Sequence, residues 1–222
     1  MAISNLKGKS MSNFRVCLLL ATFCLSASAQ SINESYRLAS KIQGTLNVLP
    51  HKESVDGEIS ACGLSFNAIT LDFATLRGQP VRLTGSYYLR RLTDKKIHYL
   101  LKLGVYDEPF GEVAFPPANA FVRSVRGAAP KNLFRIQGEN PEFALFGGEI
   151  GKESATVFKS IAEKNQFVVG FNRAKGRMDT VTTIDLTVVE TKLEKDEVVR
   201  IRSNEQINDF ISCTKELMAK IR

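Results

Sequence analysis

The sequence predicts an α+β protein in which most of the chain forms antiparallel β-sheet, with about seven to nine strands. Three observations lead to this class. Apolar and polar residues alternate along several segments of strand length, short turn-forming segments separate these strands, and the last part of the chain has helical periodicity. We therefore expect sheets joined mainly by short turns, with a C-terminal helix packed against them.

The clearest strands lie in the first half of the chain. A strand is expected over 58–73, and residues 81–90 alternate between apolar and polar side chains. Apolar residues continue one face of a third strand over 97–105. The segments 78–80 and 93–96 between these strands are rich in turn-forming residues. Three strands joined by short turns form an antiparallel meander.

The remaining elements are shorter. Residues 50–57 are predicted to be a polar connector, and 107–130 a long connection interrupted by proline. A helix is expected over 152–164, where Val157, Phe158, Ile161 and Ala162 fall on one face. Further short strands are expected at 134–136, 143–146, 167–171, 182–188 and near 199–201.

The final helix has the strongest local signals. Ser203 with Gln206 three residues later is a capping box, the pattern that begins many helices. Cys213 lies on the flank of the apolar face that follows. This face is expected to pack against the sheet and consists of Ile207, Phe210, Ile211, Leu217, Met218 and Ile221.

Residues 1–29 have the features of a secretory signal peptide. Three cations and no acid precede the apolar run 16–25, and small residues end the segment. The apolar run is shorter than the roughly 20 residues that span a bilayer. We predict that 1–29 is removed, with Met11 as a second candidate start, and that 30–222 forms a single mature domain without a transmembrane segment. Its expected location is the periplasm or outside the cell.

The mature protein is therefore expected to begin at Gln30. Mass spectrometry of the exported protein should find this N-terminus, open or cyclised to pyroglutamate. Intact Met1 or Met11 in the soluble envelope fraction would show that the segment is not a cleaved signal.

The charge of the chain argues against nucleic-acid binding. The formal net charge is +7, and residues 1–29 hold three of the cations and no acid, so that the remaining 193 residues carry +4. Nucleic-acid binding typically needs a basic stripe, which this mild charge does not indicate. It suits contact with an acidic macromolecule or protein of the cell envelope.

Two of the four cysteines, Cys62 and Cys213, remain after removal of residues 1–29. An even pair in an oxidising compartment favours a disulfide. Neither cysteine belongs to a C-x-x-C motif or has a nearby histidine in the sequence, so a redox or metal site is the weaker interpretation. We predict that Cys62 and Cys213 are joined.

The candidate binding residues are Asn172, Arg173, Lys175 and Arg177, which place three cations in a short loop between two apolar strands. Such a loop can present hydrogen-bond donors to a phosphate, a carboxylate or an acidic surface. An ordinary solvated hairpin tip is the other interpretation. In both cases we expect exposed side chains, whose removal changes stability by no more than about 1 kcal/mol.

Catalytic signals are weak. His98 should point away from the buried face of its strand, and His51 lies in the polar connector with no carboxylate at ligand spacing. The sequence lacks H-E-x-x-H and G-x-S-x-G motifs, and no metal or cofactor is expected. The glycines of 147–151 lack the Lys-Ser/Thr ending of a phosphate-binding loop. Carboxylates that are candidates by position only are Asp72, Asp107, Glu108, Asp179 and Asp185.

The leading functional hypothesis is an exported, soluble, non-catalytic binding protein of the cell envelope. Two alternatives stay open. One is an enzyme that acts on an envelope polymer through carboxylates and the cationic loop, and the other is a carrier of an apolar ligand. Facing acids in a cleft would favour the enzyme, an enclosed apolar cavity the carrier, and an exposed apolar patch the binding protein.

Overall fold

Eleven strands in three antiparallel sheets, together with helices, confirm the α+β class for the part of the chain that is described. The number of strands exceeds the seven to nine expected. The predicted signal peptide and Arg177 lie outside the described residues. The computed structural model describes residues 33–92, 96–129, 133–136, 138, 140–176 and 178–219.

The largest sheet contains the predicted meander. The order of its six strands is β1-β2-β3-β4-β7-β6, and each strand is antiparallel to its neighbours. Buried residues alternate along β3 as the sequence predicts. The strands are β1 (Gly44–Val55), β2 (Glu58–Asp72), β3 (Gln79–Arg91), β4 (Ile97–Tyr106), β6 (Phe134–Ile136) and β7 (Ala144–Glu149).

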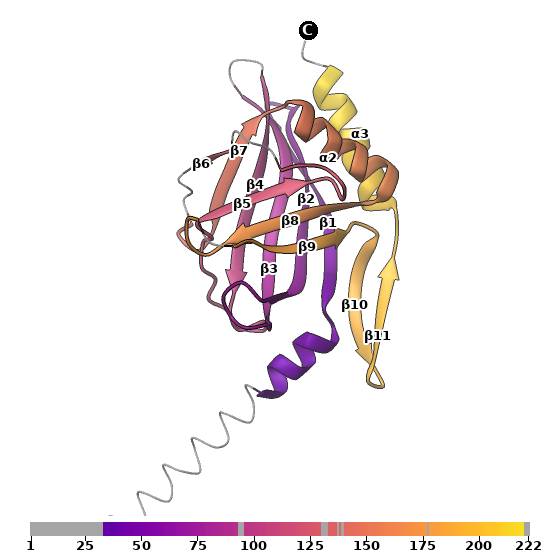
Figure 1. Ribbon diagram of the computed structural model, residues 1–222. Coiled ribbons are helices and arrows are strands. Elements are labelled where there is room, and N and C mark those ends of the chain that lie inside the picture. The colour runs from indigo at the N-terminus through magenta and orange to yellow at the C-terminus, as the bar shows by residue number, and fades with distance from the viewer. Residues whose placement is uncertain are drawn as a thin grey trace, which may run out of the picture.

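A smaller sheet and two helices cover one face of the large sheet. In Figure 1 the strands of the smaller sheet, in the order β5-β8-β9, cross in front of the larger one. These elements are β5 (Asn119–Arg123), β8 (Gln166–Asn172), β9 (Thr180–Asp185), α2 (Lys152–Lys164) and α3 (Glu205–Ala219).

A hairpin of β10 (Val188–Glu194) and β11 (Glu197–Arg202) lies beside the edge strand β1. Thr191 on this hairpin donates a hydrogen bond from Oγ1 to the carbonyl oxygen of Thr45, at 3.0 Å. The chain enters the domain through an N-terminal helix, which is helical over the described residues 33–41 (Figure 1).

The prediction that 50–57 is a connector is wrong, because most of this segment belongs to β1. The turn to β2 consists of Asp56 and Gly57, which have φ values of 52° and 78°. An Asp-Gly pair with both residues at positive φ is the favoured two-residue turn of a β-hairpin. The polar residues before the turn are strand residues that remain exposed because β1 is at the edge of the sheet.

The core lies between the two crossing sheets and extends under the helices. The Phe167 ring of β8 packs against Phe66 of β2 and Tyr87 of β3, with ring centroids 5.7 and 5.8 Å apart. Phe158 of α2 stacks on Phe210 of α3 at 5.9 Å. An aromatic side chain typically buries about 150–250 Å² in a core, which makes these rings a large part of the apolar burial.

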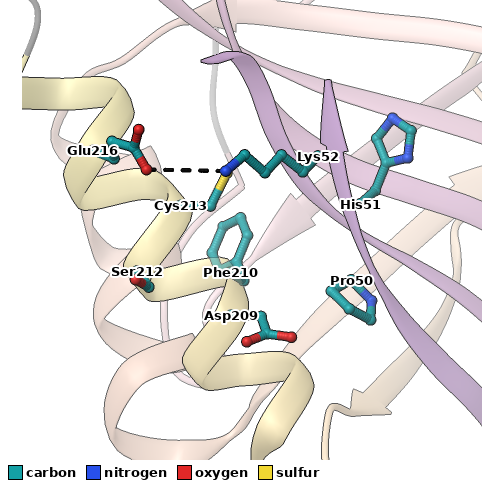
Figure 2. Close-up of a pocket in the computed structure, with 8 residues that line it drawn as sticks. All are labelled: Pro50, His51, Lys52, Asp209, Phe210, Ser212, Cys213 and Glu216. Carbon is teal, nitrogen blue, oxygen red and sulfur yellow. Dashed lines mark ion pairs between the residues drawn. The ribbon is translucent and has the colours of Figure 1, made fainter. Parts of the chain in front are cut away.

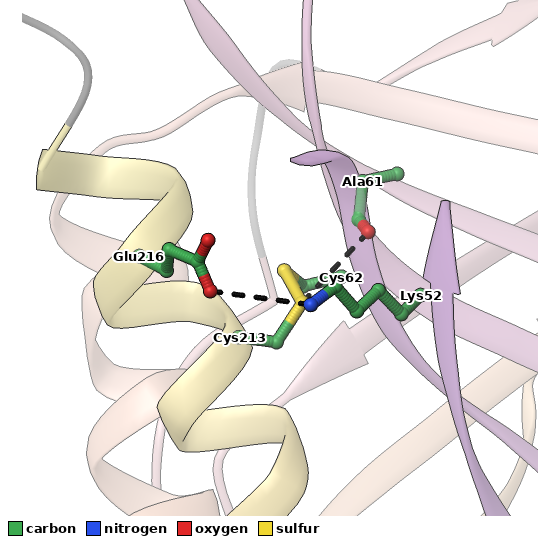
Figure 3. Close-up of a disulfide and its surroundings, with 5 residues drawn as sticks. All are labelled: Lys52, Ala61, Cys62, Cys213 and Glu216. Carbon is green, nitrogen blue, oxygen red and sulfur yellow. Dashed lines mark hydrogen bonds and ion pairs between the residues drawn. A yellow bond between two sulfur atoms is a disulfide. The ribbon is translucent and has the colours of Figure 1, made fainter. Parts of the chain in front are cut away.

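The C-terminal helix is joined to β2 as predicted. The sulfur atoms of Cys62 and Cys213 lie 2.00 Å apart, at the distance of a disulfide bond (Figure 3). Ser203 caps the helix by accepting a hydrogen bond from the backbone N–H of Glu205. Gln206 departs from the usual capping box, since its side-chain amide donates to the carbonyl oxygens of Ser203 and Leu186.

Candidate functional site

Three loops meet at one end of the molecule. They are 73–78 between β2 and β3, 107–118 between β4 and β5, and 173–179 between β8 and β9, of which Arg177 is not described. The backbone N–H of Ala118 donates to the carbonyl oxygen of Asn172 at 2.9 Å and joins the loop 107–118 to the end of β8, directly before the loop 173–179. We call these three segments the loop end.

Arg173 connects its own loop to the loop 107–118 and to Asp72, the last residue of β2 directly before the loop 73–78. Its Nε donates to Asp72 Oδ2 at 2.8 Å, and its two terminal nitrogens donate to the two carboxylate oxygens of Asp107 at 2.5 and 3.2 Å. The guanidinium also lies over the ring of Phe115, 4.3 Å from the ring centroid. A planar guanidinium has the donors to bind two carboxylates at once, which a lysine ammonium does not match in geometry.

Asp72 is the buried centre of this network. Its side chain is 0% exposed, and it also accepts hydrogen bonds from Thr180 Oγ1 at 2.9 Å and from the backbone N–H of Thr75 at 3.0 Å. Burial raises the pKa of Asp72, but the hydrogen bonds from Arg173, Thr180 and Thr75 outweigh this effect and lower its pKa below the ordinary value. The carboxylate is therefore ionised at neutral pH although it is buried.

The pKa of Arg173 shifts in the complementary direction. Burial lowers the pKa of the guanidinium, but hydrogen bonds to Asp107 and Asp72 raise it above its ordinary value. The side chain is only 16% exposed, so the expectation that Arg173 is an exposed cation is wrong. The charge of Arg173 is paired with two carboxylates of the protein itself. Loss of this side chain will therefore lower the free energy of unfolding by more than the roughly 1 kcal/mol expected for a surface residue.

The other candidate binding residues have different environments. Asn172 is 7% exposed and donates from Nδ2 to Asp179 Oδ1 at 2.9 Å. Lys175 is exposed at the turn, next to Gly176, whose φ of 76° suits glycine. Among the described residues of the predicted loop site, Lys175 is therefore the cation available to a partner.

The loop end also exposes large apolar side chains that the sequence analysis did not single out. The exposed fractions are 70% for Phe73, 45% for Phe110, 79% for Val113 and 69% for Met178. At least one of these residues lies on each of the three loops. Phe73 was expected to end the strand 58–73, but β2 ends at Asp72 and the Phe73 side chain is exposed. The other three stand in short polar or proline-rich segments without periodicity, so only the tertiary contacts of Arg173 show that these loops lie at the same end of the molecule.

Charged residues accompany these apolar side chains. Arg77 and Lys175 are exposed cations on two of the loops. Glu108 and Glu112 are exposed carboxylates on the third loop, and Asp179 is an exposed carboxylate on the loop of Lys175. The loop end is thus apolar with charges of both signs.

The N-terminal helix lies at the same end. The Tyr36 hydroxyl donates to the carbonyl oxygen of Asp107 at 3.4 Å. Burial raises the pKa of Tyr36, and the negative charges of Glu108 and Asp107 raise it further. The described chain therefore begins next to the loop end, three residues after the predicted N-terminus at Gln30.

A second candidate is a groove of about 300 Å³ between β1 and α3, with Pro50, His51 and Lys52 on the strand side. Figure 2 shows the Lys52 side chain reaching towards the helix, where its Nζ lies 3.9 Å from Glu216 Oε2. The disulfide of Cys213 lies next to this ion pair (Figure 3). The helix contributes Asp209, Phe210, Ser212, Cys213 and Glu216 to the groove.

The two histidines do not form a catalytic or metal site together. His51 turns away from the helix in Figure 2 and, contrary to expectation, has a carboxylate partner, because its Nε2 lies 3.0 Å from Glu53 Oε1. His98 lies on β4, separated from β1 by two strands, with its ring edge-on to Phe134. The described residues contain no group of three or more side chains placed to bind a metal ion.

Several of the candidate carboxylates have structural partners. Asp72 and Asp107 bind Arg173, and Asp179 accepts from Asn172. Arg202 Nη1 lies 2.5 Å from Asp185 Oδ2, and the hydrogen bonds to this carboxylate lower the pKa of Asp185 although burial raises it.

The glycines of 147–151 precede α2, but the backbone N–H of Gly151 already donates a hydrogen bond to the Ser154 hydroxyl, which caps the helix.

None of the comparisons with protein families, curated proteins or solved structures finds a match to this chain. Among the described residues, no helix has the length and apolar character that a membrane-spanning helix requires. The functional argument therefore depends on the geometry of the loop end and of the groove.

Proposed function

We propose that this protein is an exported, non-catalytic binding protein of the cell envelope that engages its partner through the loop end. The observation that carries the proposal is the exposure of Phe73, Val113 and Met178, each about 70% or more, on three loops that Arg173 holds together. Exposed apolar side chains gathered at one place mark interaction sites on soluble proteins. A cysteine pair at disulfide distance is compatible with an extracellular location.

The enzyme hypothesis has less support. Asp72 and Asp107 meet at the cationic loop, but both bind Arg173, and Asp72 is completely buried. Asp179 on the same loop accepts a hydrogen bond from Asn172. A pair of catalytic carboxylates needs room for a sugar or a water between them. The carrier hypothesis also has less support, since the groove between β1 and α3 has a mostly polar and charged lining.

The proposal predicts that the triple variant Phe73→Ser, Val113→Ser, Met178→Ser loses its partner while it keeps its fold. The three side chains are mostly exposed, so their removal takes little apolar surface out of the core. Tagged wild-type protein should retain envelope material that the variant does not. Circular dichroism and thermal unfolding should be nearly the same for both proteins.

The matched control is Leu49→Ser, Val55→Ser on β1, where the side chains are 57% and 58% exposed. This control should retain the same envelope material as the wild type. Equal capture by the triple variant and the wild type would place the binding surface elsewhere on the molecule, and loss only in the β1 control would favour the exposed side chains of β1 as that surface.

A further inference from the structure

We propose that the partner of the loop end is the surface of a phospholipid membrane, into which Phe73, Phe110, Val113 and Met178 insert. The inference rests on the proposed function and names the class of partner. It follows from how the apolar residues are distributed, which charges accompany them and where the chain enters the domain.

The apolar residues are placed on loops, one or two on each, and do not line a groove. Val113 and Phe73 are the most exposed large apolar residues of the described chain, at 79% and 70%. Single apolar side chains that project from separate loops can each enter the boundary between headgroups and acyl chains, where transfer of apolar surface out of water is favourable. A peptide partner that binds as a strand or a helix would instead lie along a sheet edge or in a continuous apolar groove.

The charges of the loop end complement phospholipid headgroups. Arg77 and Lys175 stand on two loops, where they can bind phosphate groups, and the exposed carboxylates of Glu108, Glu112 and Asp179 can face the ammonium groups of phosphatidylethanolamine. The guanidinium of Arg173 is already paired with Asp72 and Asp107, so membrane binding does not have to remove it from water. Insertion of the apolar residues therefore does not bury an unpaired charge at Arg173.

The N-terminal helix enters the domain at the same end. The Tyr36 hydroxyl contacts Asp107, so this part of the helix lies near the loop end.

The test uses the exported protein and extruded vesicles of two compositions, phosphatidylcholine with phosphatidylethanolamine, and the same mixture containing phosphatidylglycerol. Wild-type protein should float with both kinds of vesicle, because insertion of the apolar side chains does not depend on the charge of the lipid. The triple variant Phe73→Ser, Val113→Ser, Met178→Ser should bind both about tenfold or more weakly. The variant Arg77→Ala, Lys175→Ala should bind both kinds of vesicle more weakly, because it loses the cations that contact phosphate groups, and this part of the affinity should also fall with added salt.

Insertion can be measured by the fluorescence of a single introduced tryptophan, because the chain contains no tryptophan of its own. The emission of a Phe73→Trp variant should shift to the blue on addition of vesicles and be quenched by brominated acyl chains. A Val55→Trp variant, at the turn that ends β1, should show neither effect.

Absence of wild-type binding to both vesicle types would overturn the membrane proposal. Equal binding by the triple variant, or an emission spectrum of the Phe73→Trp variant that vesicles leave unchanged, would overturn it as well. If capture of envelope material still depended on the loop end in that case, the proposed function would stand with a protein or polymer as partner. If neither vesicle binding nor capture depended on the loop end, both proposals would fail.

Discussion

Replacement of Arg173 by alanine is expected to destabilise the folded protein by about 3–5 kcal/mol, because it leaves Asp72 buried and ionised without a cation. The free energy of unfolding, measured by urea denaturation, should fall by this amount. Lys175→Ala is the matched control, since it removes an exposed cation from the same loop. Its unfolding midpoint should stay close to that of the wild type.

Asp72 is the source of this destabilisation, so its neutralisation should reverse part of the loss. The double variant Asp72→Asn, Arg173→Ala lacks the buried charge and should be more stable than Arg173→Ala alone. A loss below about 1 kcal/mol in Arg173→Ala, or no recovery in the double variant, would show that the network does not stabilise the fold.

The same network predicts how stability depends on pH. Because folding lowers the pKa of Asp72, the unfolded state binds the proton more readily in acid. The stabilisation that ionised Asp72 contributes is complete above its unfolded-state pKa of about 4. It is lost as the pH falls through the lower pKa that Asp72 has in the folded protein. In Arg173→Ala, burial is no longer offset by the cation, so protonation of Asp72 relieves the unpaired charge. The stability difference between variant and wild type should therefore narrow from about pH 7 towards about pH 4.

Loss of the disulfide is expected to have the second large effect. Cys62 and Cys213 are separated by 151 residues, and in the chain-entropy model closing such a loop stabilises a protein by about 4–5 kcal/mol. The double variant Cys62→Ala, Cys213→Ala should unfold at a correspondingly lower urea concentration and should not respond to reductant. Wild-type protein in reductant should show a similar decrease.

A non-reducing peptide map should recover one cross-linked peptide pair that contains both cysteines. Reaction of both thiols with a maleimide in the native, unreduced protein would contradict the assignment. Full retention of stability by the double variant would instead show that the packing of α3 against the sheet is sufficient without the covalent bond.

The elements with strong local patterns could be predicted from the sequence. Alternation of apolar residues placed the strands of the meander, and helical spacing gave the boundaries of 152–164 and the position of the C-terminal helix. The edge strand β1 was missed because its second half is polar, and the hairpin signal of Asp56 and Gly57 was interpreted as part of a loop. An edge strand needs little apolar alternation, since few of its side chains are buried.

The candidate site depended much more on tertiary structure. The sequence by itself identified the loop of Asn172 to Arg177 and the two cysteines as a pair. It could not show that Arg173 binds Asp72 and Asp107, which are 101 and 66 residues away. Nor could it show that Phe73, Val113 and Met178 share one end of the molecule. Periodicity reports which side of its own element a residue faces, whereas the meeting of three loops depends on how two sheets pack, and no local pattern encodes that arrangement.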